Sequence, residues 1–297
     1  MKRVDENKPF TYHHAVDSIS KALSTSYKDP YIYALSVISY VTRMDKQSIL
    51  INMDNYLSKK QKDMVSTLED KLIRSYPLSY ILGNIDFYKE NYIITESVLI
   101  PRPETELIVE EAITFVNKFN KNRKSKILEI GTGSGCISIS ILNNIKNIDV
   151  QIVATDISES ALKIAQRNVN INLQKSRRSR IIFVEQDILT ELPSECFDLI
   201  ISNPPYIPLD EYKKLEKSLY FEPEIALTDF SNGLRFYKRL ALSVKNNLNT
   251  GGMAIFEIHS MNTENTLKVF KEILGKKTKL MILKDTFGRA RFLKILT

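Results

Sequence analysis

The NPPY segment, Asn203-Pro204-Pro205-Tyr206, contains residue types suited to chemistry on a planar nitrogen. An amide or exocyclic amino nitrogen is a poor nucleophile because its lone pair is delocalised, so a site that alkylates it must hold both N–H bonds. The Asn203 side-chain oxygen can accept one hydrogen, and the Pro204 backbone carbonyl can accept the other. The prolines stiffen the segment, and Tyr206 offers a flat ring for stacking. We predict that all four residues are catalytic and substrate-binding.

A glycine loop, Glu129-Ile130-Gly131-Thr132-Gly133-Ser134-Gly135, follows a short apolar run and precedes a helical pattern. Glycine lets the backbone turn tightly and approach a ligand without a Cβ in the way. The spacing is G-x-G-x-G, which differs from the G-x-G-x-x-G of dinucleotide folds. Such a loop is a weak signal by itself, because a plain turn has the same composition. The residues predicted to bind a ligand here are Glu129, Gly131, Thr132, Gly133, Ser134 and Gly135.

Two acidic residues follow the next strand-like runs of the chain. Asp156, at the end of one run and next to Ile157, can accept hydrogen bonds from both ribose hydroxyls of a nucleoside. The alternative role for Asp156 is a helix N-cap, which Ser158 could provide instead. Asp187 could accept the adenine amino group, and Ile188 could line the face of the ring. Together with the glycine loop, these residues predict a nucleoside site that includes Ile157 and borders Asn203.

The pattern from Lys126 onward supplies a scaffold that could bring these residues together. Short β-branched runs alternate with helical ones such as 159–172 and 233–249, as in an α/β fold with a mainly parallel sheet. The expected strands are 126–130, 150–155, 180–184, 197–202, 253–258, 279–284 and 290–296. The segment between the last two is too short for a crossover helix, so they should form an antiparallel hairpin.

The first third of the chain has a different pattern. Apolar residues recur at helical intervals between residues 12 and 72, and Pro77 ends the last of these runs. Between residues 81 and 101 the period shortens, as in a strand pair, before a helix expected over 104–119. We therefore predict a small N-terminal helical domain at 1–78, a β-rich connector at 79–102 and an α/β domain at 103–297.

Composition limits the class of protein without deciding it. The net charge of +7 permits an acidic or nucleic-acid partner, but a lysine-rich composition imposed by an AT-rich genome explains it more simply. No run approaches the roughly 20 apolar residues that span a bilayer, and residues 1–9 lack the apolar core of a secretory signal. Cys136 and Cys196 are expected to be reduced and buried. We expect no metal, no membrane partner and a cytoplasmic location.

The sequence resembles the release factor glutamine methyltransferases, the HemK/PrmC family. The NPPY segment also occurs in DNA adenine methyltransferases, so the more specific match lies in residues 77–88, 98–106 and 222–237. The resemblance implies a Rossmann-like class I methyltransferase domain and S-adenosyl-L-methionine as the cofactor. It also implies that the helical domain at 1–78 recognises the substrate.

The resemblance further implies that the substrate is the glutamine of the Gly-Gly-Gln loop in class I peptide chain release factors, methylated on the side-chain nitrogen N5. Arg102 and Pro103 would border the substrate cleft, although a rigid turn that starts a helix at Glu104 or Thr105 is compatible with the same residues. The enzymatic alternative is adenine-N6 methylation of DNA or RNA. Because no separate base-recognition domain is visible, we expect no stable nucleic-acid partner. A binding module that transfers no group is the third hypothesis.

Three positions depart from the family pattern. His259 lies in a segment where the family has a glycine and then a glutamine after the glutamate, Ala290 replaces an acidic residue, and Ile188 replaces an aromatic residue of some members. None of them lies in the NPPY segment, so these departures are expected to affect packing and adenine affinity more than the type of reaction.

Overall fold

The computed structural model of this chain describes residues 10–119, 124–146 and 149–297. Residues 1–9, for which the sequence predicts no secretory signal, lie outside this range. The chain forms two compact units, Met1–Gly83 and Asn84–Thr297. The predicted three-part division, with boundaries at 78 and 102, stays a prediction. Within the described ranges, no helix has the length and apolar content needed to cross a bilayer.

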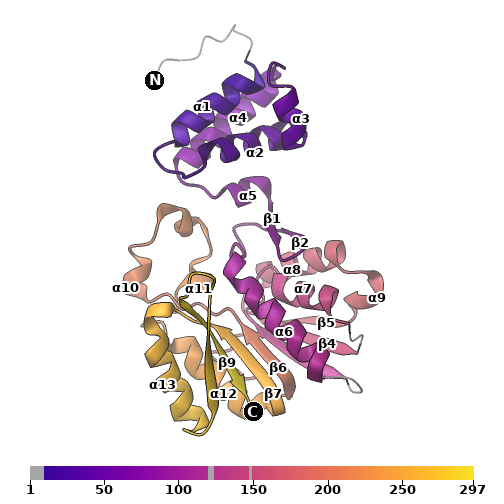
Figure 1. Cartoon of the computed structure of the whole chain (residues 1–297), viewed down its shortest axis with the longest axis vertical. Helices are drawn as coiled ribbons and strands as arrows, with labels where there is room; N and C mark the ends of the chain where they lie inside the picture. The colour runs from indigo at the N-terminus through magenta and orange to yellow at the C-terminus, as the bar shows by residue number, and fades with distance from the viewer. Residues whose placement is uncertain (1–9, 120–123, 147–148) are drawn as a thin grey trace. The chain divides into compact units, whose positions relative to one another are not determined.

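The described part of the first unit consists of helices and their connections (Figure 1), as the sequence predicts. The helices are α1 (Tyr12–Leu23), α2 (Pro30–Thr42), α3 (Lys46–Ile51), α4 (Lys59–Ile73) and α5 (Leu78–Leu82). A capping box of Ser58 and Gln61 begins α4. Apolar side chains at helical spacing, such as Ile19, Ile38 and Leu68, are buried together and give this unit a core of its own.

A seven-stranded sheet lies at the centre of the second unit, in the order β5-β4-β3-β6-β7-β9-β8. Its strands are β3 (Ser125–Ile130), β4 (Val150–Asp156), β5 (Ile181–Glu185), β6 (Phe197–Ser202), β7 (Leu248–Glu257), β8 (Lys279–Lys284) and β9 (Ala290–Leu296). Strands β3 to β7 pair in parallel, and β9 pairs antiparallel with both β7 and β8. The predicted mainly parallel sheet and its antiparallel hairpin are confirmed. Because β3 and β6 are neighbours, the glycine loop and the NPPY segment leave the sheet at the same edge.

Helices cover both faces of this sheet (Figure 1). The longer ones are α6 (Glu106–Phe119), α7 (Cys136–Asn144), α8 (Glu159–Asn172), α12 (Arg235–Asn247) and α13 (Thr263–Leu274). Leu199 and Ile201 of β6 belong to the core that includes α6 and α7, whereas Ile200 belongs to the core that includes α12 and α13. This alternation follows from the two-residue period of a strand, and it explains why strands buried on both faces have continuous apolar sequences.

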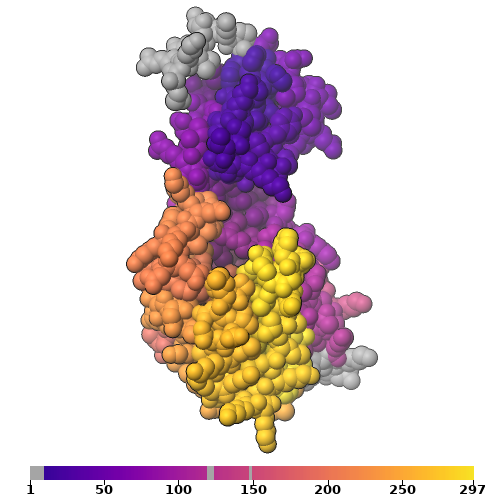
Figure 2. Space-filling model, turned by 60° about the vertical axis from the view of Figure 1, so that its left-hand side comes forward, coloured from indigo at the N-terminus to yellow at the C-terminus, as the bar shows by residue number. Residues whose placement is uncertain are grey.

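Short elements complete the second unit. They are the hairpin strands β1 (Asn84–Phe87) and β2 (Glu90–Ile93), the helices α9 (Lys175–Arg178), α10 (Leu209–Tyr212) and α11 (Glu224–Leu227), and the 3₁₀ turns η1 (Pro103–Thr105), η2 (Lys217–Phe221) and η3 (Ser260–Asn262). The hairpin confirms the strand pair expected between residues 81 and 101. Figure 2 shows the segment around α10 (orange) beside the C-terminal segments (yellow). An ion pair of 3.3 Å between His259 Nε2 and Glu211 Oε2 joins α10 to the segment that follows β7.

Two expectations need correction. Cys196 is exposed, whereas Cys136 is buried as predicted. Cys196 belongs to the connection before β6, and burial begins one residue later, at Phe197, where the strand enters the sheet. Strand β7 begins at Leu248 and not at the predicted residue 253. After Leu248, its early part, which contains Gly251 and Gly252, lacks the run of apolar side chains on which the prediction depends.

Candidate active site

A cavity of about 370 Å³ lies where β3, β4, β5 and β6 end. A second cavity of about 140 Å³ shares Arg102, Asn203 and Pro204 with the first and is also lined by Tyr206. The predicted residues that line the larger cavity are Arg102, Gly131, Thr132, Gly133, Ser134, Asp156, Ile157, Asp187, Ile188, Asn203, Pro204 and Pro205. The structure therefore brings together residues that lie up to about a hundred positions apart in the chain. Among the predicted residues, Glu129, Gly135 and Pro103 line neither cavity.

The glycines of the glycine loop have two different environments. Gly131 and Gly133 have positive φ angles of 72° and 54°, and a Cβ added to either would meet nothing within 4 Å. Their free side faces open space that a ligand could fill. Gly135 is different, because an added Cβ would lie 3.1 Å from the Cβ of Ala165 in α8. The third glycine is thus needed for close packing of α8 against the start of α7.

Glu129 lies beneath the glycine loop and is fully buried. The hydroxyls of Thr132 and Ser138 both donate to its Oε2 atom, at 2.7 Å in the case of Thr132. Its other oxygen, Oε1, is buried and has no hydrogen-bond partner among the described residues. Burial, with a smaller contribution from the charge of Asp156, raises the pKa of Glu129 to about 7. An unpartnered buried acceptor at this place fits a ligand that brings an N–H donor or a cation.

Asp156 is held by backbone donors on both sides. Its Oδ2 accepts from the Gly133 amide at 2.8 Å, and its Oδ1 accepts from the Ser158 amide at 2.9 Å. Ser158, and not Asp156, caps α8, because its hydroxyl oxygen accepts from the Ala161 amide at 3.2 Å. The carboxylate therefore stays at the cavity wall, where burial raises the pKa of Asp156. Each oxygen retains capacity for a further donor such as a hydroxyl group.

The segment after β5 lines the same cavity. Asp187 Oδ1 accepts from the Leu189 amide at 2.8 Å, which fixes a tight turn. Ile188 is buried and belongs to the core beneath α12. Its carbonyl accepts from Arg239 Nε at 2.7 Å, so the apolar side chain is held at the cavity wall.

The NPPY segment begins where β6 ends. The Ser202 hydroxyl donates to the Ile130 carbonyl at 2.7 Å and ties the end of β6 to the end of β3. Asn203 Nδ2 donates to Thr105 Oγ1 at 3.3 Å, and the Tyr206 hydroxyl donates to Glu257 Oε1 at 2.9 Å. With its amide nitrogen engaged, Asn203 has its side-chain oxygen available as an acceptor for a substrate.

Arg102 and Pro103 lie in the connection that enters α6. Arg102 Nη2 contacts Glu222 Oε1 at 2.6 Å, and Glu222 Oε2 accepts from the Ile100 amide at 2.9 Å. Pro103 opens the η1 turn and is exposed, and α6 begins at Glu106, just after the two residues at which the sequence predicts a helix start. Arg102 thus lines both cavities in a position fixed by a buried carboxylate.

Three residues at the site were not predicted as site residues. Thr105 lines the larger cavity, Glu257 binds both Thr105 and Tyr206, and Glu222 holds Arg102. The sequence does single out the two glutamates. Glu257 ends an apolar strand, and Glu222 lies in a segment of family resemblance. Glutamate is rarely buried without a partner, so a glutamate at such a position is a candidate for a site role. Thr105 also lies in a segment of family resemblance, 98–106, but threonine is common in the first turn of a helix, so its residue type gives no further signal.

Comparisons with known proteins identify relatives. The methyltransferase small domain family matches residues 111–218. The release factor glutamine methyltransferase of Flavobacterium psychrophilum is 35% identical over 85% of this chain and 87% of its own length. That of Lactococcus lactis is 32% identical over 93% of this chain and 97% of its own. The chain belongs to the release factor glutamine methyltransferase family. A solved family structure, the release-factor-specific protein-(glutamine-N5) methyltransferase of Alicyclobacillus acidocaldarius, is 26% identical, with a TM-score of 0.40 over 66% of this chain and 93% of its own.

Release factor glutamine methyltransferases use S-adenosyl-L-methionine, and the residues of this member fit that cofactor. The cofactor has a cationic amino group, for which Glu129 Oε1 is an unpartnered buried acceptor. It has a ribose, for which the Asp156 carboxylate is available at the cavity wall. The open side of Gly131 and Gly133 leaves room for a ligand next to the backbone. Among the described residues, no group of three or more His, Cys, Asp or Glu side chains is arranged to hold a metal ion.

Proposed function

We propose that this chain methylates the side-chain nitrogen N5 of the glutamine in the Gly-Gly-Gln loop of class I peptide chain release factors. One observation carries the proposal. Asn203 and Pro204 line both cavities, so the residues suited to hold a planar amide lie between the candidate cofactor space and a smaller space open to a substrate side chain. The family membership of the chain supports the same reaction.

The residues of the NPPY segment hold and orient the target amide in this proposal. S-adenosyl-L-methionine, when bound, supplies a methyl group activated by a sulfonium. Asn203 Oδ1 accepts one N–H of the target amide, the Pro204 carbonyl accepts the other, and Pro205 and Tyr206 shape the wall against which the amide lies. Because the amide is a weak nucleophile, alignment and fixed dipoles provide most of the catalysis.

Cofactor binding in the proposal falls to the remaining predicted residues. The glycine loop and Glu129 bind the methionine part, Asp156 and Ile157 the ribose, and Asp187 and Ile188 the adenine. Arg102 and Pro103 border the substrate side, which the ion pair of the partly exposed Arg102 with the buried Glu222 carboxylate supports.

The substrate partner in the proposal is a protein, and no stable nucleic-acid partner is required. The helical part at 1–78 recognises the release factor, the part at 79–102 connects the two domains, and the part at 103–297 carries out methyl transfer. The reaction takes place in the cytoplasm. Exposed apolar side chains on α2 support the recognition role, among them Tyr31, Ile32 and Tyr40. Such side chains are common at surfaces that bind proteins.

The test is transfer of labelled methyl from S-adenosyl-L-methionine to a purified class I release factor. A Gln→Ala variant of its Gly-Gly-Gln loop and duplex DNA are assayed in parallel. Label on the unmodified release factor alone supports the proposal. Label on DNA would replace it with adenine methylation, and label on none of them would favour a binding module.

A further inference from the structure

A chain of hydrogen bonds leads from Asn203 to a buried carboxylate. Asn203 Nδ2 lies 3.3 Å from Thr105 Oγ1, and Thr105 Oγ1 lies 2.7 Å from Glu257 Oε2. Thr105 and Glu257 are 3% and 1% exposed, so water cannot replace either partner freely. The three residues come from the connection after β6, from η1 and from the end of β7. Only the folded chain brings them together.

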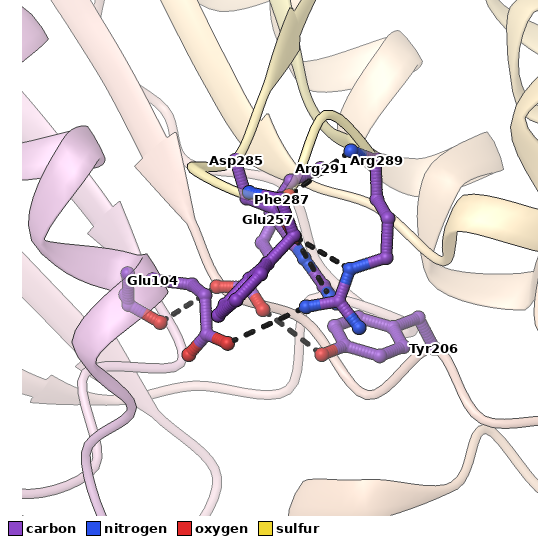
Figure 3. A network of polar contacts seen from close by, with 8 residues as sticks. Glu104, Tyr206, Glu257, Asp285, Phe287, Arg289 and Arg291 are labelled. Atoms are coloured by element: carbon purple, nitrogen blue, oxygen red, sulfur yellow. Dashed lines mark hydrogen bonds and ion pairs between the residues drawn. The ribbon is translucent and has the colours of Figure 1, made fainter.

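The second oxygen of Glu257 is also engaged. It accepts from the Tyr206 hydroxyl at 2.9 Å, so one carboxylate links both ends of the NPPY segment. Figure 3 shows Tyr206 and Glu257 facing each other, with Asp285, Arg289 and Arg291 of the C-terminal hairpin beside them. Burial raises the pKa of Glu257, whereas the hydroxyls of Thr105 and Tyr206 and the positive charge of Arg291 act in the opposite direction.

The number of available hydrogens determines which atom donates in each of these hydrogen bonds. Both Glu257 oxygens accept, one from Tyr206 and the other from Thr105, and a threonine hydroxyl has only one hydrogen, which is therefore used on Glu257. The Thr105 oxygen can then only accept from Asn203, so the NH₂ end of the Asn203 amide must face Thr105. The oxygen end faces the opposite way. An inverted amide would direct an N–H donor at the N–H donors of the target amide and would be unable to hold it.

We infer that Thr105 and Glu257 are positioning residues, which orient the Asn203 amide so that its oxygen faces the target amide. Glu257 orients the Thr105 hydroxyl, and Thr105 orients Asn203, although neither needs to touch the substrate. The inference rests on the proposed function. It assigns to Glu257 a second effect as well, since the same carboxylate holds the Tyr206 ring.

The experiment compares Thr105→Val with Thr105→Ser in steady-state methylation of a class I release factor. Valine keeps the shape of threonine without its hydroxyl, whereas serine keeps the hydroxyl. We expect Thr105→Val to lower kcat about tenfold or more, with KM for the release factor and Kd for S-adenosyl-L-methionine changed less than about threefold. Thr105→Ser should stay within about threefold of the unmodified enzyme in kcat.

Two further variants separate orientation from loss of stability. Thr266→Val removes another fully buried hydroxyl, which donates to Asn262 O at 3.0 Å in α13, and should leave kcat unchanged. Glu257→Gln replaces one acceptor by a donor and should lower kcat as Thr105→Val does. The double variant should lose less than the product of the two single losses, because both act on the same amide.

The inference would be overturned if Thr105→Val retained the kcat of the unmodified enzyme, or if Thr105→Ser were as impaired as Thr105→Val. An equal fall in kcat for Thr266→Val would also overturn it. Failure of the proposed function is a separate result, because in that case the unmodified enzyme itself would not methylate the release factor.

Discussion

At the scale of single residues, the site depends on polar groups with one atom left available. Asn203 has its nitrogen engaged by Thr105 and its oxygen available. Glu129 has Oε2 engaged by two hydroxyls and Oε1 without a partner among the described residues. When one atom of a side chain has a fixed partner, the side chain is already ordered and its other polar atom has a fixed direction. Binding of a ligand to that atom then costs little further side-chain entropy. The residues are therefore preorganised acceptors for N–H and O–H donors.

Replacement of Asn203 by alanine tests the acceptor role. The Asn203→Ala variant lacks the oxygen that, in the proposed function, holds one N–H of the target amide, so we expect kcat to fall by about 100-fold or more. The Kd for S-adenosyl-L-methionine should change less than about threefold, because the cofactor has its own contacts. Turnover assays and calorimetric titration measure the two quantities.

Asp156→Ala is the matched comparison, with the opposite pattern expected. Loss of the Asp156 carboxylate should weaken S-adenosyl-L-methionine binding by about tenfold or more, because it is the acceptor that we propose for the two ribose hydroxyls. An unchanged Kd for Asp156→Ala, or full turnover by Asn203→Ala, would contradict the assigned roles.

The pKa of Glu129 predicts a pH dependence of stability. Burial raises this pKa from 4.5 to about 7 in the folded chain. A raised folded pKa contributes stability that is fully present below the unfolded value and is lost as pH rises through the folded value. Between about pH 4.5 and 7 the free energy of unfolding should therefore fall by on the order of 3 kcal/mol through this group. Glu129→Gln cannot titrate and should lack that part of the decrease.

Urea unfolding at a series of pH values measures the effect, with the exposed Glu159→Gln as control. The same slope in unmodified protein and Glu129→Gln would show that Glu129 does not titrate in this range.

At the scale of elements, the ends of parallel strands position the site. The segments that follow β3, β4, β5 and β6 line one cavity, because the carboxyl ends of parallel strands share an edge. Within the glycine loop, different glycines have different roles. Gly131 and Gly133 face open space, while Gly135 allows contact between α7 and α8. One motif thus combines a ligand-facing part with a packing part.

Gly131→Ala and Gly83→Ala separate ligand contact from backbone strain. Both glycines have similar positive φ angles, 72° and 74°, and in both an added Cβ would meet nothing within 4 Å. Each substitution should cost about 1 kcal/mol of stability. Only Gly131→Ala should also weaken S-adenosyl-L-methionine binding, by about tenfold, because its methyl group enters the cavity. Equal Kd values for the two variants would show that Gly131 does not approach the cofactor.

At the scale of the whole molecule, each unit has its own apolar core. The cavity residues all belong to Asn84–Thr297. Chemistry and partner recognition can therefore reside in different parts of the chain, which is common where a catalytic fold is combined with a second domain.

Surface substitutions on α2 test the recognition role of the first unit. Ile32 is 53% exposed, so Ile32→Ser should leave stability nearly unchanged. If α2 contacts the release factor, KM for it should rise about threefold or more, with kcat and cofactor affinity unchanged. Ile171→Ser on α8, where the side chain is 62% exposed, is the matched control. A KM unchanged by Ile32→Ser would remove this part of α2 from the proposed surface.

The sequence by itself determined what depends on local chemistry. The parallel sheet, the C-terminal hairpin and the helical first unit follow from the periods of apolar residues, and the glycine loop and NPPY segment follow from backbone properties of glycine and proline. The relatives confirm the family that these motifs indicate.

Only the tertiary structure decided which polar groups meet. Thr105 and Glu257 are 152 positions apart, and Arg102 and Glu222 are 120 positions apart. Neither pair has a spacing that a periodic pattern could reveal, because their contacts depend on strand order and on the path of the connections. Burial makes these partnerships decisive, since a buried polar group without a partner costs free energy that an exposed one does not.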